Sequence, residues 1–173
     1  MSGNREKLHV IVLPEDEANE KIANGFLLSL NINARAIIID KYAGGWRKVV
    51  SKFTDQLVPE MRKYRACATV LLIDFDCYEG SSYEDRLHKV TRAIPDDLKN
   101  RVFVLGVLSE PEKLKAKSRM SFEKIGETLA DGCPDNKNEL WKDELLKHNE
   151  GELSRILLLV RPFLFSVSRF SSV

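Results

Sequence analysis

The sequence has few cysteines, no long apolar run and almost no net charge. Its 173 residues include 3 cysteines, Cys67, Cys77 and Cys133, too few and too scattered for a disulfide framework or a zinc knuckle. No apolar stretch approaches the ~20 residues that span a bilayer. The initial segment, MSGNREK, lacks the apolar part of a signal peptide. We therefore expect a cytoplasmic protein that does not contact a membrane.

The charge balance excludes a chain that binds nucleic acid through its overall charge. Lys and Arg number 27 and Asp and Glu 26, which gives a net charge of +1, so any nucleic-acid contact would need a local basic patch. Hydrophobic residues make up 43% and charged residues 31%, the balance of a folded chain. At this length we expect one domain, residues 1–173.

Four short apolar runs predict buried strands. They are bounded by polar residues or glycine and cover residues 8–13, 34–40, 66–74 and 101–107. Between them the apolar positions have helical spacing, over residues 18–30, 49–61 and 87–94. Near-continuous apolar strands that alternate with helices indicate a parallel sheet covered on both faces. The sequence therefore predicts a three-layer, Rossmann-like α/β fold with about four strands.

The C-terminal third predicts helices only. Apolar spacing suggests helices over residues 122–129, 140–145 and 153–160, and Asn149 with Glu152 has the spacing of a capping box before the last of them. Pro162 should lie near the end of that helix. We expect an α/β core at 8–115, a helical appendage at 116–165 and a frayed tail at 166–173.

Acidic residues follow several of the predicted strands. In doubly wound sheets, ligands bind beyond the carboxyl ends of the strands. The first run leads into PEDE, the third ends in DFD and the fourth leads into SEPEK. In an extended DFD, Asp74 and Asp76 point to the same side and Phe75 to the other. With Glu15 beside them, these carboxylates favour Mg²⁺ or Mn²⁺, which prefer oxygen ligands and accept phosphate oxygens.

The first-strand glutamate in VLPEDE, the DxD in LLIDFD and the βαβαβαβ order resemble the Toprim domain. The similarity is greatest to small stand-alone Toprim-like proteins of bacteria and phages, many associated with defence or mobile elements. The resemblance implies a metal-dependent nuclease acting on DNA or RNA. It implies that Glu15 is a metal ligand or general acid/base, that Asp74 and Asp76 bind the metal, and that Glu110 or Glu112 is an additional acid.

Several alternatives remain at these positions. Glu17 can replace Glu15 as the first acid, and Asp16 and Glu17 equally suit a helix N-terminus. Gly44 and Gly45 fit a phosphate-holding turn or a plain strand-to-helix turn. A basic series after the fourth strand suits either a nucleic-acid contact or a solvated loop or helix start: Lys113, Lys115, Lys117 and Arg119.

Two other classes of function compete with the nuclease. In the first, the fold is a non-catalytic interaction module that binds a protein partner or a second copy through the C-terminal helices, including the apolar Phe163–Phe165. In the second, it is a phospho-acceptor receiver domain, which requires a fifth strand that the sequence does not predict. Cys77, directly after the DxD, suits a redox-sensitive neighbour of the site or a small buried residue.

Overall fold

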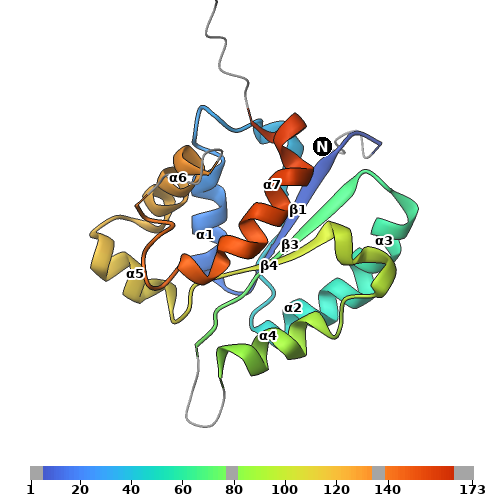
Figure 1. Ribbon diagram of the computed structural model, residues 1–173, viewed down its shortest axis with the longest axis horizontal. Helices are drawn as coiled ribbons and strands as arrows, with labels where there is room; N and C mark the ends of the chain where they lie inside the picture. Colours follow the sequence, from blue (N-terminus) through green and yellow to red (C-terminus); the bar gives the residue numbers. More distant parts are fainter. Residues whose placement is uncertain (1–5, 77–81, 134–138, 166–173) are drawn as a thin grey trace, which may run out of the picture.

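Four parallel strands form the centre of the molecule. The computed structural model describes residues 6–76, 82–133 and 139–165. The strands are β1 (His9–Pro14), β2 (Ile37–Ile39), β3 (Cys67–Leu72) and β4 (Val102–Leu105), in the order β2-β1-β3-β4 (Figure 1). In the register, Val12 pairs with Ile39 on one side and with Val70 on the other, and Leu71 pairs with Val104. The predicted parallel α/β fold is confirmed.

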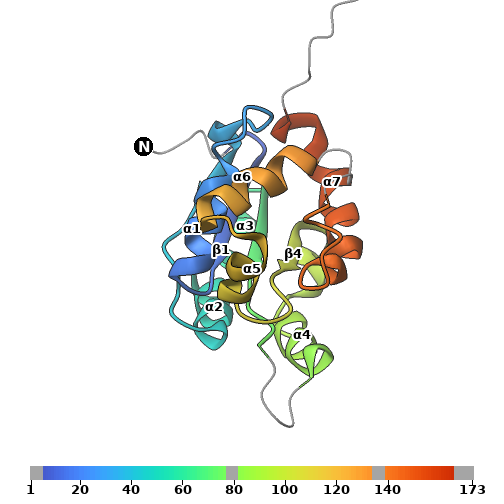
Figure 2. The ribbon, with the colours of Figure 1, turned by 90° about the vertical axis from the view of Figure 1, so that its left-hand side faces the viewer.

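Helices cover both faces of this sheet. Figure 1 shows α2 (Trp46–Lys52), α3 (Val58–Lys63) and α4 (Tyr83–Thr91) at the lower right of the strands. The opposite face carries α1 (Glu17–Phe26), α6 (Phe122–Gly132) and α7 (Glu150–Leu164), which Figure 2 shows from the side. The helix α5 (Pro111–Ser118) follows β4 and leads into α6. The remaining helical turns are η1 (Ala34–Ala36), η2 (Phe53–Leu57), η3 (Asp96–Arg101) and η4 (Lys147–Asn149).

Successive side chains along the strands point to opposite faces of the sheet and form two hydrophobic cores, one on each face. On β1, Ile11 and Leu13 pack toward α2, α3 and α4, whereas Val10 packs toward α7. All three side chains are buried. Strands buried on both faces explain why the sequence reads as continuous apolar runs rather than as an alternating pattern.

Several predicted elements differ from the structure, and the predicted helix 18–30 ends at Phe26. Strand β2 is shorter than the predicted 34–40, because residues 34–36 form a 3₁₀ turn. The predicted helix 49–61 is divided by a π-helical turn, since Pro59 has no N–H to donate within the helix. A helix over 140–145 was wrong: these residues form turns, in which the Asp143 carboxylate accepts the N–H of Leu145 at 2.9 Å. Such side-chain bonds compete with helical ones.

The outer edge of β4 is hydrogen-bonded by side chains near the start of α7. Arg155 donates to the carbonyl of Val102, Glu152 accepts the N–H of Val104, and Asn149 both donates to and accepts from the backbone of Gly106. The predicted capping box was therefore wrong: Glu152 bonds to β4, Asn149 bonds to Gly106 directly after β4, and the side chain of Asn149 makes no capping bond to α7.

The end of α7 packs against the domain's own core. Leu164 is buried, Phe163 and Phe165 are half-buried against the same cluster, and Pro162 lies within the last turn of the helix. Among the described residues, no helix has the length and apolar character needed to cross a membrane. The predicted tail, 166–173, lies outside the described residues.

Candidate functional site: an acidic cleft

Glu15 links the ends of β1 and β3. It directly follows β1, and its N–H continues the ladder by donating to the carbonyl of Leu72 at 2.9 Å. Its carboxylate Oε2 accepts the N–H of Asp74 at 2.7 Å. This backbone donor holds the carboxylate at the carboxyl end of the sheet.

Asp74 lies where β3 passes out of the sheet. The backbone stays paired with the chain after β4 through the N–H of Phe75, which donates to the carbonyl of Val107 at 2.9 Å. Phe75 is buried in the core, as the alternation predicts, while Asp74 and Asp76 both line the acidic cleft described below. An aspartate carboxylate lies within roughly 5 Å of its own amide nitrogen, so the Glu15 and Asp74 carboxylates are within about 8 Å of one another.

Asp16 and Asn19 join this pair from the first turn of α1. Asp16 is the N-cap, and its Oδ1 accepts from the backbone N–H of Asn19 at 2.9 Å and from the side-chain Nδ2 of Asn19 at 3.0 Å. The same Nδ2 donates to Asp74 at 2.8 Å, so the two aspartates share one donor. The capping interpretation of Asp16 is confirmed, although the residue also belongs to the acidic group.

Burial changes the protonation of these acids. Loss of solvent raises the pKa of Asp74 to about 8, with further contributions from the negative charges of Asp16 and Glu15, while the hydrogen bond from Asn19 opposes the rise. Burial also raises the pKa of Glu15, against the lowering effect of the backbone N–H of Asp74. Near neutral pH, the group therefore holds a proton on Asp74.

These side chains form one wall of a cleft of about 450 Å³. We call it the acidic cleft, and its lining residues are Glu15, Asp16, Trp46, Asp74, Asp76, Arg86, Glu110 and Glu112. The structure thus brings together acids that follow three strands, including both alternatives after β4. Glu17 is not among them, because its carboxylate pairs with Lys21 along α1 at 2.9 Å. Of the two candidates for the first acid, the geometry favours Glu15.

Arg86 and Trp46 also line the cleft, and neither is among the site residues that the sequence predicts. Arg86 donates to the carbonyl of Asp74 at 2.9 Å, and its guanidinium lies 5.5 Å from the centre of the Trp46 ring. Trp46 is the first residue of α2, and Arg86 lies in the first turns of α4. In the sequence, the only feature that could have indicated Trp46 as a residue of the cleft is its position directly after Gly44 and Gly45.

The glycine pair behaves as a strand-to-helix turn. Gly44 and Gly45 have φ angles of 92° and 137°, which favour glycine. Their N–H groups donate to the carbonyl of Glu15 at 2.8 and 3.2 Å. Because both donors already have an acceptor, they hold Glu15 in place rather than offering a phosphate site. Cys77 lies outside the described residues.

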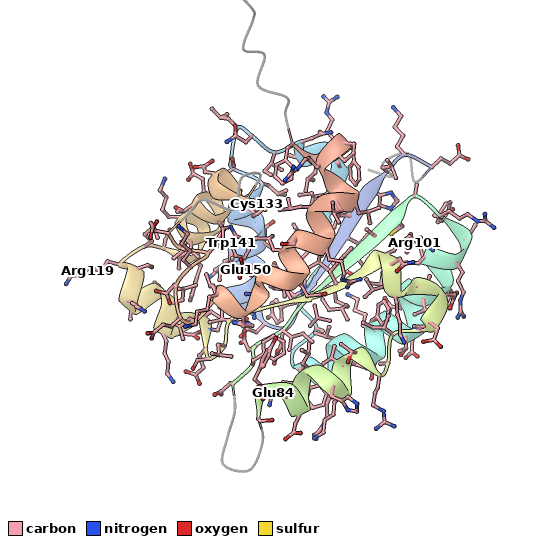
Figure 3. The ribbon with its side chains drawn as sticks, in the orientation of Figure 1. Glu84, Arg101, Arg119, Cys133, Trp141 and Glu150 are labelled. Carbon is pink, nitrogen blue, oxygen red and sulfur yellow. The ribbon has the colours of Figure 1, made fainter. Side chains whose placement is uncertain are left out.

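The basic series lies on α5 and does not line the cleft. Lys117 pairs with Asp143 at 2.8 Å, and the Lys115 ammonium lies 4.8 Å from the centre of the Phe122 ring. Lys113 is exposed, and Arg119 follows the end of α5 at the periphery of the molecule (Figure 3). On a helix, residues 113 and 117 share a face that residue 115 does not, so the alternating sequence does not produce one continuous patch.

The described residues of the acidic cleft do not form a closed protein cage for a metal ion. Within residues 6–76, 82–133 and 139–165, no three His, Cys, Asp or Glu side chains are arranged to hold a metal ion. Mg²⁺ commonly keeps several waters and binds through one or two carboxylates together with phosphate oxygens of the substrate. Glu15 and Asp74, with Asp76 nearby, provide such a partial oxygen set.

Comparisons with known proteins give no match. No protein-family model matches the chain, and the searches of curated proteins and of solved structures return no match either. The resemblance to the Toprim domain therefore depends on the glutamate after β1, on the DxD after β3 and on the order of the elements, and it stays a prediction.

Proposed function

We propose that the protein is a Mg²⁺- or Mn²⁺-dependent, Toprim-like nuclease that hydrolyses phosphodiesters of DNA or RNA. The observation that carries this proposal is the convergence of acids from the ends of β1, β3 and β4 on one cleft. In the proposal, Glu15, Asp74 and Asp76 hold the ion, with Glu110 at the margin. The resemblance connects such proteins with bacterial defence or mobile elements.

The crowding of carboxylates supports a cation at this place. Burial and neighbouring negative charge raise the pKa of Asp74 to about 8, so the free protein neutralises part of the group with a proton. A divalent cation offers the same neutralisation and would displace that proton. We therefore expect metal binding to release a proton and to tighten as the pH rises.

The chain's own groups supply the remaining functions. When bound, the ion would activate water and stabilise the negative charge that develops on the phosphate oxygens. Glu15 accepts the backbone N–H of Asp74, which fixes the position of its carboxylate, and it serves as a ligand or as a general acid/base. Arg86 offers a cation for a phosphate oxygen, and Trp46 beside it offers a ring for base stacking.

The test combines metal binding with cleavage. Calorimetric titration with MgCl₂ and MnCl₂ and incubation with supercoiled plasmid and single-stranded RNA should show binding and cleavage by the wild type. Asp74→Asn and Asp76→Asn should lose both, with unchanged circular dichroism. Glu17→Gln is the matched control, because Glu17 lies outside the cleft, and it should behave as wild type. A wild-type protein that neither binds metal nor cleaves either substrate would refute the proposal.

A non-catalytic interaction module is the second candidate. It is favoured by the engagement of Glu15 and Asp74 with N–H groups of the fold itself, since such bonds give these acids a structural role without any metal. The partner would be another protein or a second copy of this chain. Dimerisation in sedimentation velocity that is unaffected by Mg²⁺, in a protein without nuclease activity, is the result expected for this candidate.

The receiver-domain alternative has less support. The strand order β2-β1-β3-β4 matches the first four strands of the flavodoxin-like order. However, the described residues contain no fifth strand, and α7 side chains bond to the edge where it would pair. Asp74, the acid after β3, is 7% exposed and bonded to Asn19, a poor position for a phospho-acceptor.

A further inference from the structure

The segment that joins β2 to α2 carries exposed cations and an exposed aromatic ring. Lys41, Arg47 and Lys48 are exposed, and Tyr42 is 37% exposed. Among the ion pairs of the described residues, none involves these three cations. All three are therefore available to an anionic ligand that approaches from the solvent.

Backbone hydrogen bonds hold this segment beside the end of β1. The N–H of Ala43 donates to the carbonyl of Pro14 at 2.9 Å, and the N–H of Gly44 donates to the carbonyl of Glu15 at 2.8 Å. Tyr42 precedes Gly44 by two residues, so their Cα atoms are at most about 7 Å apart. The exposed side chains of the segment are therefore fixed close to Glu15, one of the proposed metal ligands.

Trp46 connects these side chains to the acidic cleft. It lines the cleft, and the guanidinium groups of Arg47 and Arg86 lie 5.1 and 5.5 Å from the centre of its ring. The Lys48 ammonium lies 3.7 Å from the position that a Cβ atom would take on Gly44. We call these side chains together the basic–aromatic surface, and its members are Lys41, Tyr42, Trp46, Arg47, Lys48 and Arg86.

Cations interleaved with aromatic rings suit an unpaired strand of nucleic acid. The cations contact the phosphates and the rings stack on the bases. In a duplex the bases already stack on one another, so such rings find no partner along its length. Access to the acids favours the same substrate. Asp74 is only 7% exposed, and the cleft of about 450 Å³ has the size of a small-molecule pocket, so one flexible strand reaches these acids more readily than a duplex does.

We infer that the basic–aromatic surface binds single-stranded nucleic acid and places it at the acidic cleft. Lys41, Arg47 and Lys48 contact phosphates outside the cleft, and Tyr42 stacks on a base. The inference rests on the proposed function, because it names the form of nucleic acid that this site receives. DNA and RNA strands share the chemistry that the surface recognises, so both are tested.

The experiment measures binding in EDTA, where metal-dependent cleavage cannot occur. The probes are fluorescein-labelled oligo(dT), oligo(U) and a DNA duplex, each of about 12 nucleotides, and the readout is fluorescence anisotropy. The wild type should bind at least one single strand at least about tenfold more tightly than the duplex. Tyr42→Ala should weaken this binding at least about fivefold, because a stacked base is lost. Arg47→Gln with Lys48→Gln should reduce the slope of log affinity against log salt by about 1.4, because each phosphate contact with a single strand contributes about 0.7.

The matched control is the double variant Lys63→Gln with Arg65→Gln. It removes two exposed cations beside Tyr64, whose ring centre lies 5.2 Å from the Lys63 ammonium, but at the opposite end of the sheet, before β3 begins. This variant should bind as wild type. The inference is overturned if neither single strand binds, if the duplex binds as tightly, or if the variants of the basic–aromatic surface bind like the control.

The same proteins distinguish this inference from the nuclease proposal. A wild type that binds a single strand in EDTA, as expected, but cleaves nothing with Mg²⁺ or Mn²⁺ would refute the nuclease proposal alone. A wild type that cleaves nucleic acid, while the variants of the basic–aromatic surface bind and cleave like the control, would refute the inference alone.

Discussion

Replacing Asp74 by asparagine should change how the stability of the protein depends on pH. Burial raises the pKa of this carboxyl from 3.8 to about 8 in the folded protein. Between these two values the folded chain holds a proton that the unfolded chain has released. The free energy of unfolding therefore decreases as the pH rises through this window, by about 1.4 kcal/mol per pH unit for one whole proton. The asparagine side chain does not titrate, so the variant lacks this contribution.

The magnitude follows from the width of the window. From pH 5 to pH 8, one whole proton corresponds to about 4 kcal/mol, so the expected effect is about 2–4 kcal/mol. Relative to wild type, Asp74→Asn should therefore gain about 2–4 kcal/mol of unfolding free energy over this range. This relative gain arises because the free energy of unfolding of the variant changes less with pH than that of the wild type.

Urea unfolding between pH 5 and pH 8, with EDTA present, measures this difference. Asp76→Asn is the matched control, since Asp76 lines the same cleft but is less buried, and its profile should run parallel to that of the wild type. Parallel profiles for wild type and Asp74→Asn would refute the reasoning, because they would show that Asp74 is ionised in both states across the whole range.

Three further predictions concern other parts of the molecule. Glu152→Ala should cost about 1–3 kcal/mol in urea unfolding, because the N–H of Val104 loses its acceptor, while Glu152→Gln should cost less; equal losses would contradict the hydrogen-bond explanation. Burial lowers the pKa of His148, so on acidification the unfolded chain takes up a proton before the folded chain does. The free energy of unfolding therefore falls as the pH decreases below about 6.5. His148→Leu should lack this decrease when urea unfolding is measured from pH 7 to pH 5. Burial raises the pKa of the Cys133 thiol to about 12. Iodoacetamide should therefore modify this thiol at least about 100-fold more slowly in the folded protein than in urea, as measured by mass spectrometry of the peptide that contains it. Comparable rates would show that the thiol is accessible.

The sequence predicts the fold because burial leaves a local signal. Runs such as 8–13 and 66–74 are apolar on both faces, which is required of a strand that packs helices on each side. The acids that follow them could be placed at one edge, since the ends of parallel strands meet there. The same reasoning could not find Arg86, because an arginine in the first turns of a helix is common and only the tertiary structure brings it to Asp74.

Other failures have the same physical origin. Asn149 and Glu152 have the spacing of a local capping motif, but both side chains bond to β4, more than forty residues earlier in the chain. Asn19 resembles an ordinary polar residue of a helix in the sequence, and only its burial beside Asp74 in the folded protein gives it importance. Side chains that serve distant backbone have no periodic signature along the sequence.

The bonds between α7 and β4 also set an order of events during synthesis. β4 leaves the ribosome before the residues that cover its edge, Asn149, Glu152 and Arg155. Until α7 folds, the backbone groups of Val102, Val104 and Gly106 are open to any extended chain, and exposed edges of this kind promote aggregation. A nascent chain that pauses before residue 149 is therefore the form most exposed to misassembly, and docking of α7 is the step that ends this exposure.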